Sequence, residues 1–70
     1  MYENALMTRR EVEYYVRLSR ASIYSLMRKH RFPTPIKVGA QAVRWRGSEI
    51  DEWLEARPRA TGEIKIVQKP

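Results

Sequence analysis

The sequence predicts a small, mainly α-helical domain with one short β-hairpin. Apolar residues recur at helical spacing in two neighbouring segments, residues 12–16 and 23–27, and again at residues 50–54. Between the second and third of these stripes, at residues 36–46, single apolar residues alternate with basic ones, as they do in a half-buried strand. A chain of 70 residues has room for one domain with a small core, which these segments would build together.

The first helix is expected from Arg9 to Val16. Thr8 and Glu11 have the spacing of a capping box, in which a hydroxyl and a carboxylate each satisfy a free backbone N–H at a helix start. The apolar stripe that this helix would bury consists of Val12, Tyr15 and Val16. Before it, Ala5–Met7 could pair as a brief edge strand. Tyr14 lies off the stripe, where it would cover the core edge or contact a neighbouring protomer.

A second helix is expected from Arg20 to His30, with Ser19 as its N-cap. Its inward side would hold Ile23, Leu26, Met27 and His30. Residues 17–19 separate the two helices, and a turn of three residues between two short helices is the spacing of a helix-turn-helix. The sequence therefore predicts this motif between Thr8 and His30.

A β-hairpin is predicted after residues 32–35, because the two prolines of this segment cannot continue a helix. The alternating apolar residues are Ile36 and Val38 in the first strand and Val43 and Trp45 in the second. Residues 39–41 would form the turn between them. Because neighbours along a strand point to opposite faces, we expect three basic residues together on the outer face: Lys37, Arg44 and Arg46.

A third helix is predicted with Ser48 and Asp51 as its capping pair. Its buried stripe would consist of Ile50, Trp53 and Leu54, and Pro58 follows its end. Its exposed side carries four carboxylates, which would keep that side away from a polyanion: Glu49, Asp51, Glu52 and Glu55. We place the domain at residues 1–57 and expect the largely polar residues 58–70 to form a disordered tail.

Positive charge is concentrated in one part of the chain. The formal net charge of the whole chain is +6. Residues 8–46 contain ten Lys and Arg against two Glu, a balance of +8, whereas residues 47–57 carry −3. A domain that only had to stay soluble would mix both signs over its surface. The distribution therefore predicts that residues 8–46 contact an anionic partner such as a nucleic acid.

Composition argues against several other classes of protein. Three short helices and a hairpin can hardly enclose a catalytic pocket, so we expect no enzyme activity, no cofactor and no small-molecule ligand. The chain has no cysteine and a single histidine, so we expect no metal site and a cytoplasmic location. No run of 18 apolar residues occurs, and the first residues do not resemble an export signal. No membrane association is expected.

Several spaced motifs resemble the AlpA-like phage regulators and excisionases. The motifs are Ser19-Arg20, Tyr24, Phe32-Pro33 and Arg44-Trp45, within the strings LSRASIYSLMRKHRFPTPIKVG and AVRWRGSEIDEWLEAR. The likeness covers residues 6–57 and implies a winged helix-turn-helix akin to MerR DNA-binding domains, in a bacterial, nucleoid-associated regulator. It also implies binding to short repeated DNA sites, with an integrase or further copies of the chain as partners.

The sequence departs from the family pattern at two places. The family usually has glycine where this chain has Arg17, in the turn between the first two helices. A glycine or a small polar residue is also common at His30-Arg31. The turn position can require a positive φ, which costs free energy in any residue but glycine.

The exposed face of the second helix is the candidate for the major groove of double-stranded DNA. Its residues are Ser19, Arg20, Ala21, Tyr24, Ser25 and Arg28. An arginine can contact guanine through two hydrogen bonds, a small residue lets the backbone approach a thymine methyl, and hydroxyls can bond phosphate. The alternative is a helix face that is merely solvated.

The hairpin is the candidate wing. Its DNA-binding residues would be Lys37, Gln41, Arg44 and Arg46, joined by Arg9 of the first helix. The basic residues would contact phosphates, and the tip at residues 39–42 could enter the minor groove. Charged residues also protect the edge of a sheet, so the two roles can coexist.

Two other functions compete with sequence-specific binding of duplex DNA. The basic face could bind an acidic protein, in a module that inhibits another regulator or an integrase. The aromatic residues could stack on unpaired bases of RNA or single-stranded DNA, although their spacing matches the apolar stripes of a core. Competition by a DNA duplex separates the first of these from the main hypothesis.

Overall fold

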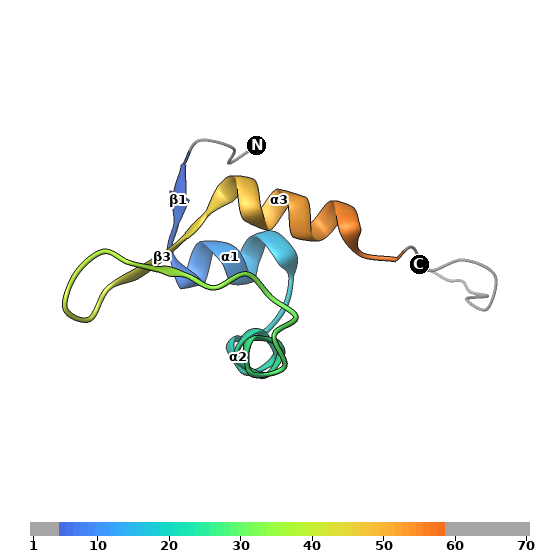
Figure 1. Ribbon diagram of the computed structural model, residues 1–70, viewed down its shortest axis with the longest axis horizontal. Coiled ribbons are helices and arrows are strands. Elements are labelled where there is room, and N and C mark those ends of the chain that lie inside the picture. Colours follow the sequence, from blue (N-terminus) through green and yellow to red (C-terminus); the bar gives the residue numbers. More distant parts are fainter. Residues whose placement is uncertain (1–4, 59–70) are drawn as a thin grey trace.

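The computed structural model describes residues 5–58, which form three helices and three short strands (Figure 1). In chain order they are β1 (Leu6–Met7), α1 (Arg9–Val16), α2 (Arg20–Arg28), β2 (Ile36–Lys37), β3 (Val43–Arg46) and α3 (Gly47–Ala56). The predicted fold class, mainly α with a small hairpin and compatible with a winged helix-turn-helix, is confirmed. The predicted disordered tail at residues 58–70 lies, apart from residue 58, outside the described residues.

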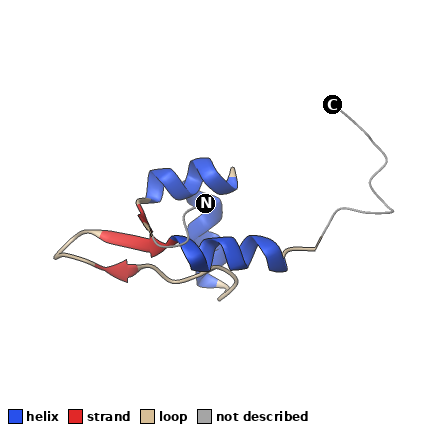
Figure 2. Ribbon diagram, turned by 90° about the horizontal axis from the view of Figure 1, so that it is seen from above, coloured by secondary structure: helices blue, strands red, loops and turns tan. Residues whose placement is uncertain are grey.

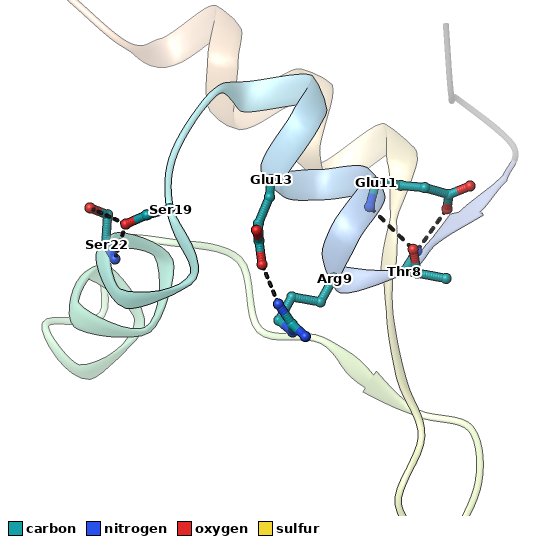
Figure 3. Close-up of polar contacts among 6 residues, drawn as sticks. All are labelled: Thr8, Arg9, Glu11, Glu13, Ser19 and Ser22. Atoms are coloured by element: carbon teal, nitrogen blue, oxygen red, sulfur yellow. Dashed lines mark hydrogen bonds and ion pairs between the residues drawn. The ribbon is translucent and has the colours of Figure 1, made fainter.

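Helix α1 begins and ends where the sequence indicates. The Glu11 N–H donates to Thr8 Oγ1 at 3.2 Å, and the Thr8 N–H donates to Glu11 Oε1 at 2.8 Å, so both halves of the capping box are present (Figure 3). The helix ends because Arg17 adopts the left-handed conformation, with φ 61° and ψ 38°. The positive φ that the family resemblance implies for this turn is confirmed.

Helix α2 begins at the predicted residue and ends earlier than predicted. Ser19 Oγ accepts a hydrogen bond from the Ser22 N–H at 3.1 Å, which caps the N-terminus. At the other end, His30 has φ 60° and its N–H donates to the Met27 carbonyl at 2.9 Å, while the Arg31 N–H donates to the Leu26 carbonyl at 2.8 Å. This is a Schellman motif, a tight C-terminal turn that reverses the chain.

The structure corrects the expectation that His30 lies on the inward side of α2. The helical spacing that would place it inward stops at Arg28, and the Schellman turn leaves the His30 side chain exposed. Ile23 is fully buried, and Leu26 and Met27 are half-buried, as the apolar stripe predicts.

The three strands form an antiparallel sheet in the order β1-β3-β2. Strand β1 confirms the predicted edge pairing, with Met7 opposite Trp45. The tip of the hairpin is closed by the Val38 N–H, which donates to the Ala42 carbonyl at 2.9 Å. Strand β3 thus pairs on both sides and holds the hairpin against the rest of the domain.

The expectation that Lys37 shares the outer face of the hairpin with Arg44 and Arg46 is wrong. In the observed register Lys37 lies opposite Val43, and Ile36 lies opposite Arg44. Residues directly opposed in an antiparallel pair project to the same face, so Lys37 lies on the face of Val43. Register depends on the length and geometry of the turn, which alternation within each strand does not reveal.

Helix α3 follows β3 without a connecting loop, and this overturns its predicted cap. Its N-cap is Arg46, which makes no side-chain capping hydrogen bond, so Ser48 lies inside the first turn rather than before it. Asp51 instead accepts a hydrogen bond from the Tyr15 hydroxyl at 2.5 Å and so joins α3 to α1. The buried Gly47 N–H donates to the Ala5 carbonyl at 2.8 Å, which joins the start of α3 to the residue before β1.

The core takes one or more residues from every helix and from both β1 and β3. Its buried members are Met7, Val12, Ile23, Phe32, Trp45 and Ile50. Trp45 is the largest of these that is fully buried, and its Nε1–H donates to the Pro33 carbonyl at 2.9 Å. Trp53 is half-buried, packs edge-on against Phe32 with 4.7 Å between ring centroids, and donates its Nε1–H to the Arg31 carbonyl at 2.8 Å.

His30→Gly should stabilise the fold by about 0.5–1 kcal/mol, because glycine adopts positive φ without steric cost. In a domain of this size that corresponds to a rise in Tm of roughly 3–6 °C, measurable by circular dichroism. The matched control is Lys29→Gly: Lys29 has φ −91°, so glycine gains nothing there and should lower Tm. Equal effects at both positions would contradict the strain at His30.

Trp45→Phe should destabilise the fold more than Trp53→Phe. Both substitutions keep an aromatic ring and remove one N–H donor, but the Trp45 bond lies at a fully buried side chain and the Trp53 bond at a half-buried one. We expect a loss of about 1–3 kcal/mol at Trp45, where water cannot replace the donor, and under about 1 kcal/mol at Trp53. Urea unfolding of both variants measures the difference, and the reverse order would contradict the assigned core.

Candidate nucleic-acid interface

The predicted recognition residues of α2 form one strip, with Ala21, Ser25 and Arg28 on the side opposite Ile23 and Arg20 and Tyr24 at its flank. Arg20, Ala21 and Arg28 are exposed, and Tyr24 and Ser25 are half-buried. Their spacing of one, four, five and eight residues from Arg20 places them on one face of a helix. The structure therefore brings the α2 candidates into a single continuous strip.

Ser19 has a structural task at the start of this strip. Its hydroxyl accepts from the Ser22 N–H and also donates to Ser22 Oγ at 3.1 Å (Figure 3). The side chain therefore fixes the N-terminus of α2, where the helix dipole favours an anion such as phosphate. Ser19 therefore positions α2 by capping it, and this role is separate from the DNA contact that the sequence predicts for Ser19.

Two arginines of the strip carry charge that no carboxylate among residues 5–58 neutralises. Within residues 5–58, neither Arg20 nor Arg28 forms an ion pair. The Arg20 guanidinium lies 5.8 Å from the centroid of the Tyr24 ring, a cation–π contact that holds it along the helix. Both guanidinium groups can thus bind a phosphate or a guanine without first breaking an ion pair.

The hairpin presents its basic residues on two faces rather than one. Arg44 and the exposed Arg46 share the outer face, and the Arg44 guanidinium donates to the Val43 carbonyl at 2.8 Å. Lys37 is exposed on the opposite face, and Gln41 is exposed at the tip. The hairpin can therefore present positive charge to a polyanion from both of its faces, whereas the sequence analysis placed all of it on one.

Arg9 is engaged in a contact that the sequence analysis missed. Its guanidinium forms an ion pair with Glu13, one turn further along α1, and both side chains are partly buried (Figure 3). The i, i+4 spacing of opposite charges could have revealed the pair. Phosphate binding by Arg9 therefore has to compete with this carboxylate.

Arg17, the C-cap residue of α1, was not assigned to any site, whereas Tyr14 was expected to cover the core edge or contact a neighbouring protomer. The exposed Arg17 lies with its guanidinium carbon 4.5 Å from the centroid of the Tyr14 ring, and Tyr14 is 71% exposed. Arg17 could have been singled out from the sequence. The family usually has glycine at this position, so an arginine there has a steric cost.

The acidic helix and the candidate interface lie at opposite sides of the molecule. Figure 1 shows α2 at the lower edge and α3 at the upper edge, with α1 between them. Glu49, Glu52 and Glu55 are exposed on α3. A polyanion would be repelled from that side and attracted to α2 and the hairpin, so the charge distribution orients the domain.

Other kinds of site find no support in the part of the chain that the structure describes. No group of three or more side chains among residues 5–58 could hold a metal ion. None of the described helices has the length and apolar character needed to cross a membrane.

Comparison with known proteins gives one family and one curated relative. A family model described as "Prophage CP4-57 regulatory protein (AlpA)" matches residues 5–58, the residues that the structure describes. An uncharacterized protein, ORF88, of enterobacteria phage P4 is 40% identical over 47 residues, which cover 67% of this chain and 53% of that protein. The chain thus matches about half the length of this relative. No solved structure matches.

Glu13→Gln should strengthen binding to duplex DNA if Arg9 contacts a phosphate. The substitution removes the carboxylate that competes for the Arg9 guanidinium, and it also removes a negative charge from the basic segment. We expect the slope of log K against log salt to steepen by about 0.9, which corresponds to one more neutralised phosphate. Fluorescence anisotropy at several salt concentrations measures it.

The control is Glu13→Gln combined with Arg9→Gln. The double variant should lose the gain in affinity and the steeper slope. A gain that persists without Arg9 would exclude Arg9 as a phosphate contact and assign the effect to net charge alone.

Proposed function

The chain belongs to the AlpA family of prophage regulatory proteins, and we propose from this premise that it binds double-stranded DNA sequence-specifically through α2 and the hairpin. The observation that carries the proposal is the exposed strip of α2. It presents Arg20 and Arg28, free of ion pairs within residues 5–58, on either side of small and hydroxyl-bearing residues, on the side away from the acidic α3. A helix of this kind fits the major groove of B-form DNA.

In the proposed complex α2 enters the groove with its N-terminus leading. Ala21 lets the backbone approach the base edges, and it can contact a thymine methyl group. Arg28 or Arg20 donates two hydrogen bonds to guanine O6 and N7. The hydroxyls of Tyr24 and Ser25 contact phosphates and so set the position of the helix in the groove.

The hairpin contributes contacts beside the groove. Arg44 and Arg46 reach phosphates from the outer face, and Lys37 reaches them from the other. The tip, with Gln41, is placed to enter the adjacent minor groove. These contacts raise affinity and its dependence on salt, while base contacts by α2 carry the sequence preference.

The biological role that we propose is that of a phage or prophage regulator in the bacterial cytoplasm, bound to the nucleoid. It acts on transcription, on the direction of site-specific recombination as an excisionase, or on both, with an integrase as a partner in the second case. A single domain of this size buries a limited surface, so tight specific binding needs more than one copy on adjacent sites. Selection of bound fragments from the host genome distinguishes promoters from attachment sites.

A module that inhibits another protein through its basic face is the second candidate function. It is favoured by the same observation, the positive charge of residues 8–46. The two functions differ in their response to competitor: a duplex bound specifically resists an excess of unrelated duplex, whereas an acidic-protein site binds duplex weakly and without sequence preference.

Arg28→Ala should weaken binding to a selected duplex about tenfold or more and relax the preference at one base pair, because a bidentate arginine–guanine contact contributes roughly 1–3 kcal/mol. Lys29→Ala is the matched control: it removes the same charge from the neighbouring exposed position, off the recognition strip. Arg44→Ala should instead weaken binding to all sequences alike and lower the salt slope by about one. Gel-shift titrations with selected and scrambled duplexes test all three, and parent-like binding by Arg28→Ala would contradict the assigned strip.

A further inference from the structure

Helix α1 carries an exposed stripe that the proposed DNA interface does not use. The stripe consists of Arg10, Tyr14 and Arg17, spaced four and three residues apart. Arg10 and Tyr14 lie on the side of α1 opposite the buried Val12, and Arg17, the C-cap residue, holds its guanidinium over the Tyr14 ring. Among the large apolar residues that are exposed between residues 5 and 58, Tyr14 is the most exposed, at 71%. An aromatic ring flanked by two arginines is a composition that is enriched in protein interfaces.

Arg17 indicates that the stripe has a use. Its φ of 61° strains any residue with a Cβ, and glycine would relieve the strain. Its guanidinium lies 4.5 Å from the centroid of the Tyr14 ring, so the strained residue holds its charge beside the tyrosine. Neither Arg10 nor Arg17 forms an ion pair within residues 5–58. No carboxylate of the described part of the chain therefore competes with a partner for this charge.

A complementary surface exists on α3 of the same chain. It is a shallow hollow of about 530 Å³ with a mostly apolar floor, lined by Ser48, Asp51, Glu52, Glu55 and Ala56. Glu52 and Glu55 lie at its rim and form no ion pair among the described residues, whereas Asp51 is held by the Tyr15 hydroxyl. The hollow thus offers the aliphatic carbons of these side chains to an aromatic ring and carboxylates to flanking cations.

The two surfaces cannot meet within one molecule. In Figure 2, seen from above, α1 and α3 are separate helices and α2 runs crosswise to both. Each surface lies on the side of its helix that faces away from the buried residue of that helix, Val12 in α1 and Ile50 in α3. Neither surface includes a residue of α2 or of the hairpin. Both therefore stay accessible when α2 lies in a groove, and the partner that fits each of them is the other surface on a second copy.

We propose that copies of this chain associate head to tail, with the α1 stripe of one copy docked in the α3 hollow of the next. Tyr14 enters the hollow, and Arg10 and Arg17 pair with the rim carboxylates Glu52 and Glu55. Because the two sides of the contact differ, the association does not close as a two-fold dimer and can continue along adjacent DNA sites. Association on DNA rests on the proposed function, whereas the contact between copies does not.

The contact is small, because one short helix face meets another, so the association in solution is weak and salt-dependent. Copies bound to adjacent sites of one duplex are held at high effective concentration, which makes the same contact sufficient for cooperative binding. Free protein and DNA-bound protein therefore give two independent readouts of one interface.

Charge reversal tests the proposal on the full chain. Sedimentation velocity over a range of concentrations in about 0.05–0.1 M salt should show concentration-dependent association of the parent, weakening as salt rises. Arg10→Glu/Arg17→Glu and Glu52→Arg/Glu55→Arg should each associate about tenfold or more weakly. An equimolar mixture of the two variants should regain association, because the reversed surfaces are complementary to each other.

The control Lys29→Glu/Arg31→Glu changes the net charge by the same amount at exposed positions outside both surfaces and should associate like the parent. Variants that associate like the parent, or a mixture that does not recover, would overturn the proposal. The proposal would also be overturned if the parent protein is monomeric in solution and binds a long random-sequence duplex without cooperativity. If the α1 variant binds a duplex long enough for one copy markedly more weakly than the control does, the stripe is a phosphate contact instead.

Arg17→Gly separates a role in association from a role in folding. The substitution relieves the backbone strain, so it should raise Tm, yet it removes one charge of the stripe and should lower association. A variant with higher Tm and unchanged association would contradict the proposal. Failure of the parent to bind any duplex, with association intact, would instead contradict the proposed function alone.

Discussion

The burial of Trp45 is the constraint on which the arrangement of this small domain depends. The side chain is fully buried, it lies on the strand that pairs with both others, and its Nε1–H is held by the Pro33 carbonyl. Strand β3 also leads directly into α3. With Trp45 inward, alternation sends Arg44 and Arg46 outward, and the bond to Pro33 holds the segment that leaves α2. One side chain thus holds the hairpin, α3 and the segment after α2 in place relative to each other.

Two residues in the left-handed conformation flank helix α2. They determine the position of the helix, and with it the distribution of charge over the molecule. Arg17 and His30 have φ near 60°, and these two turns, with the Ser19 cap, define where the helix begins and ends. The resulting position puts the strip of α2 at one edge of the molecule and the carboxylates of α3 at the other. This small domain thus contains two strained backbone positions, and the fold that they help to form keeps the basic strip of α2 apart from the carboxylates of α3.

Local signals in the sequence located the three helices, whereas the end of α2, the cap of α3 and the register of the hairpin were not predicted correctly. The capping box at Thr8 and the apolar stripes are local signals, and they located α1 and the start of α2. Ser48 was misread because β3 runs directly into α3, so the N-cap is Arg46 and the Gly47 N–H is satisfied by the distant Ala5 carbonyl. The face of Lys37 depends on register, which is set by the hairpin turn. The exposed strip of α2 was predictable from helical spacing, whereas the Arg9–Glu13 pair was overlooked.

The central claim is that α2 and the hairpin, held together through Trp45, form one surface for duplex DNA. Titration of the ¹⁵N-labelled chain with a selected duplex, followed by amide chemical shifts, tests it most directly. The account predicts that the largest shifts fall in residues 19–28 and 39–46, with the outward side of α3 unaffected at a ratio of one chain per site. Shifts that are largest along residues 48–56, or absent from α2, would contradict it.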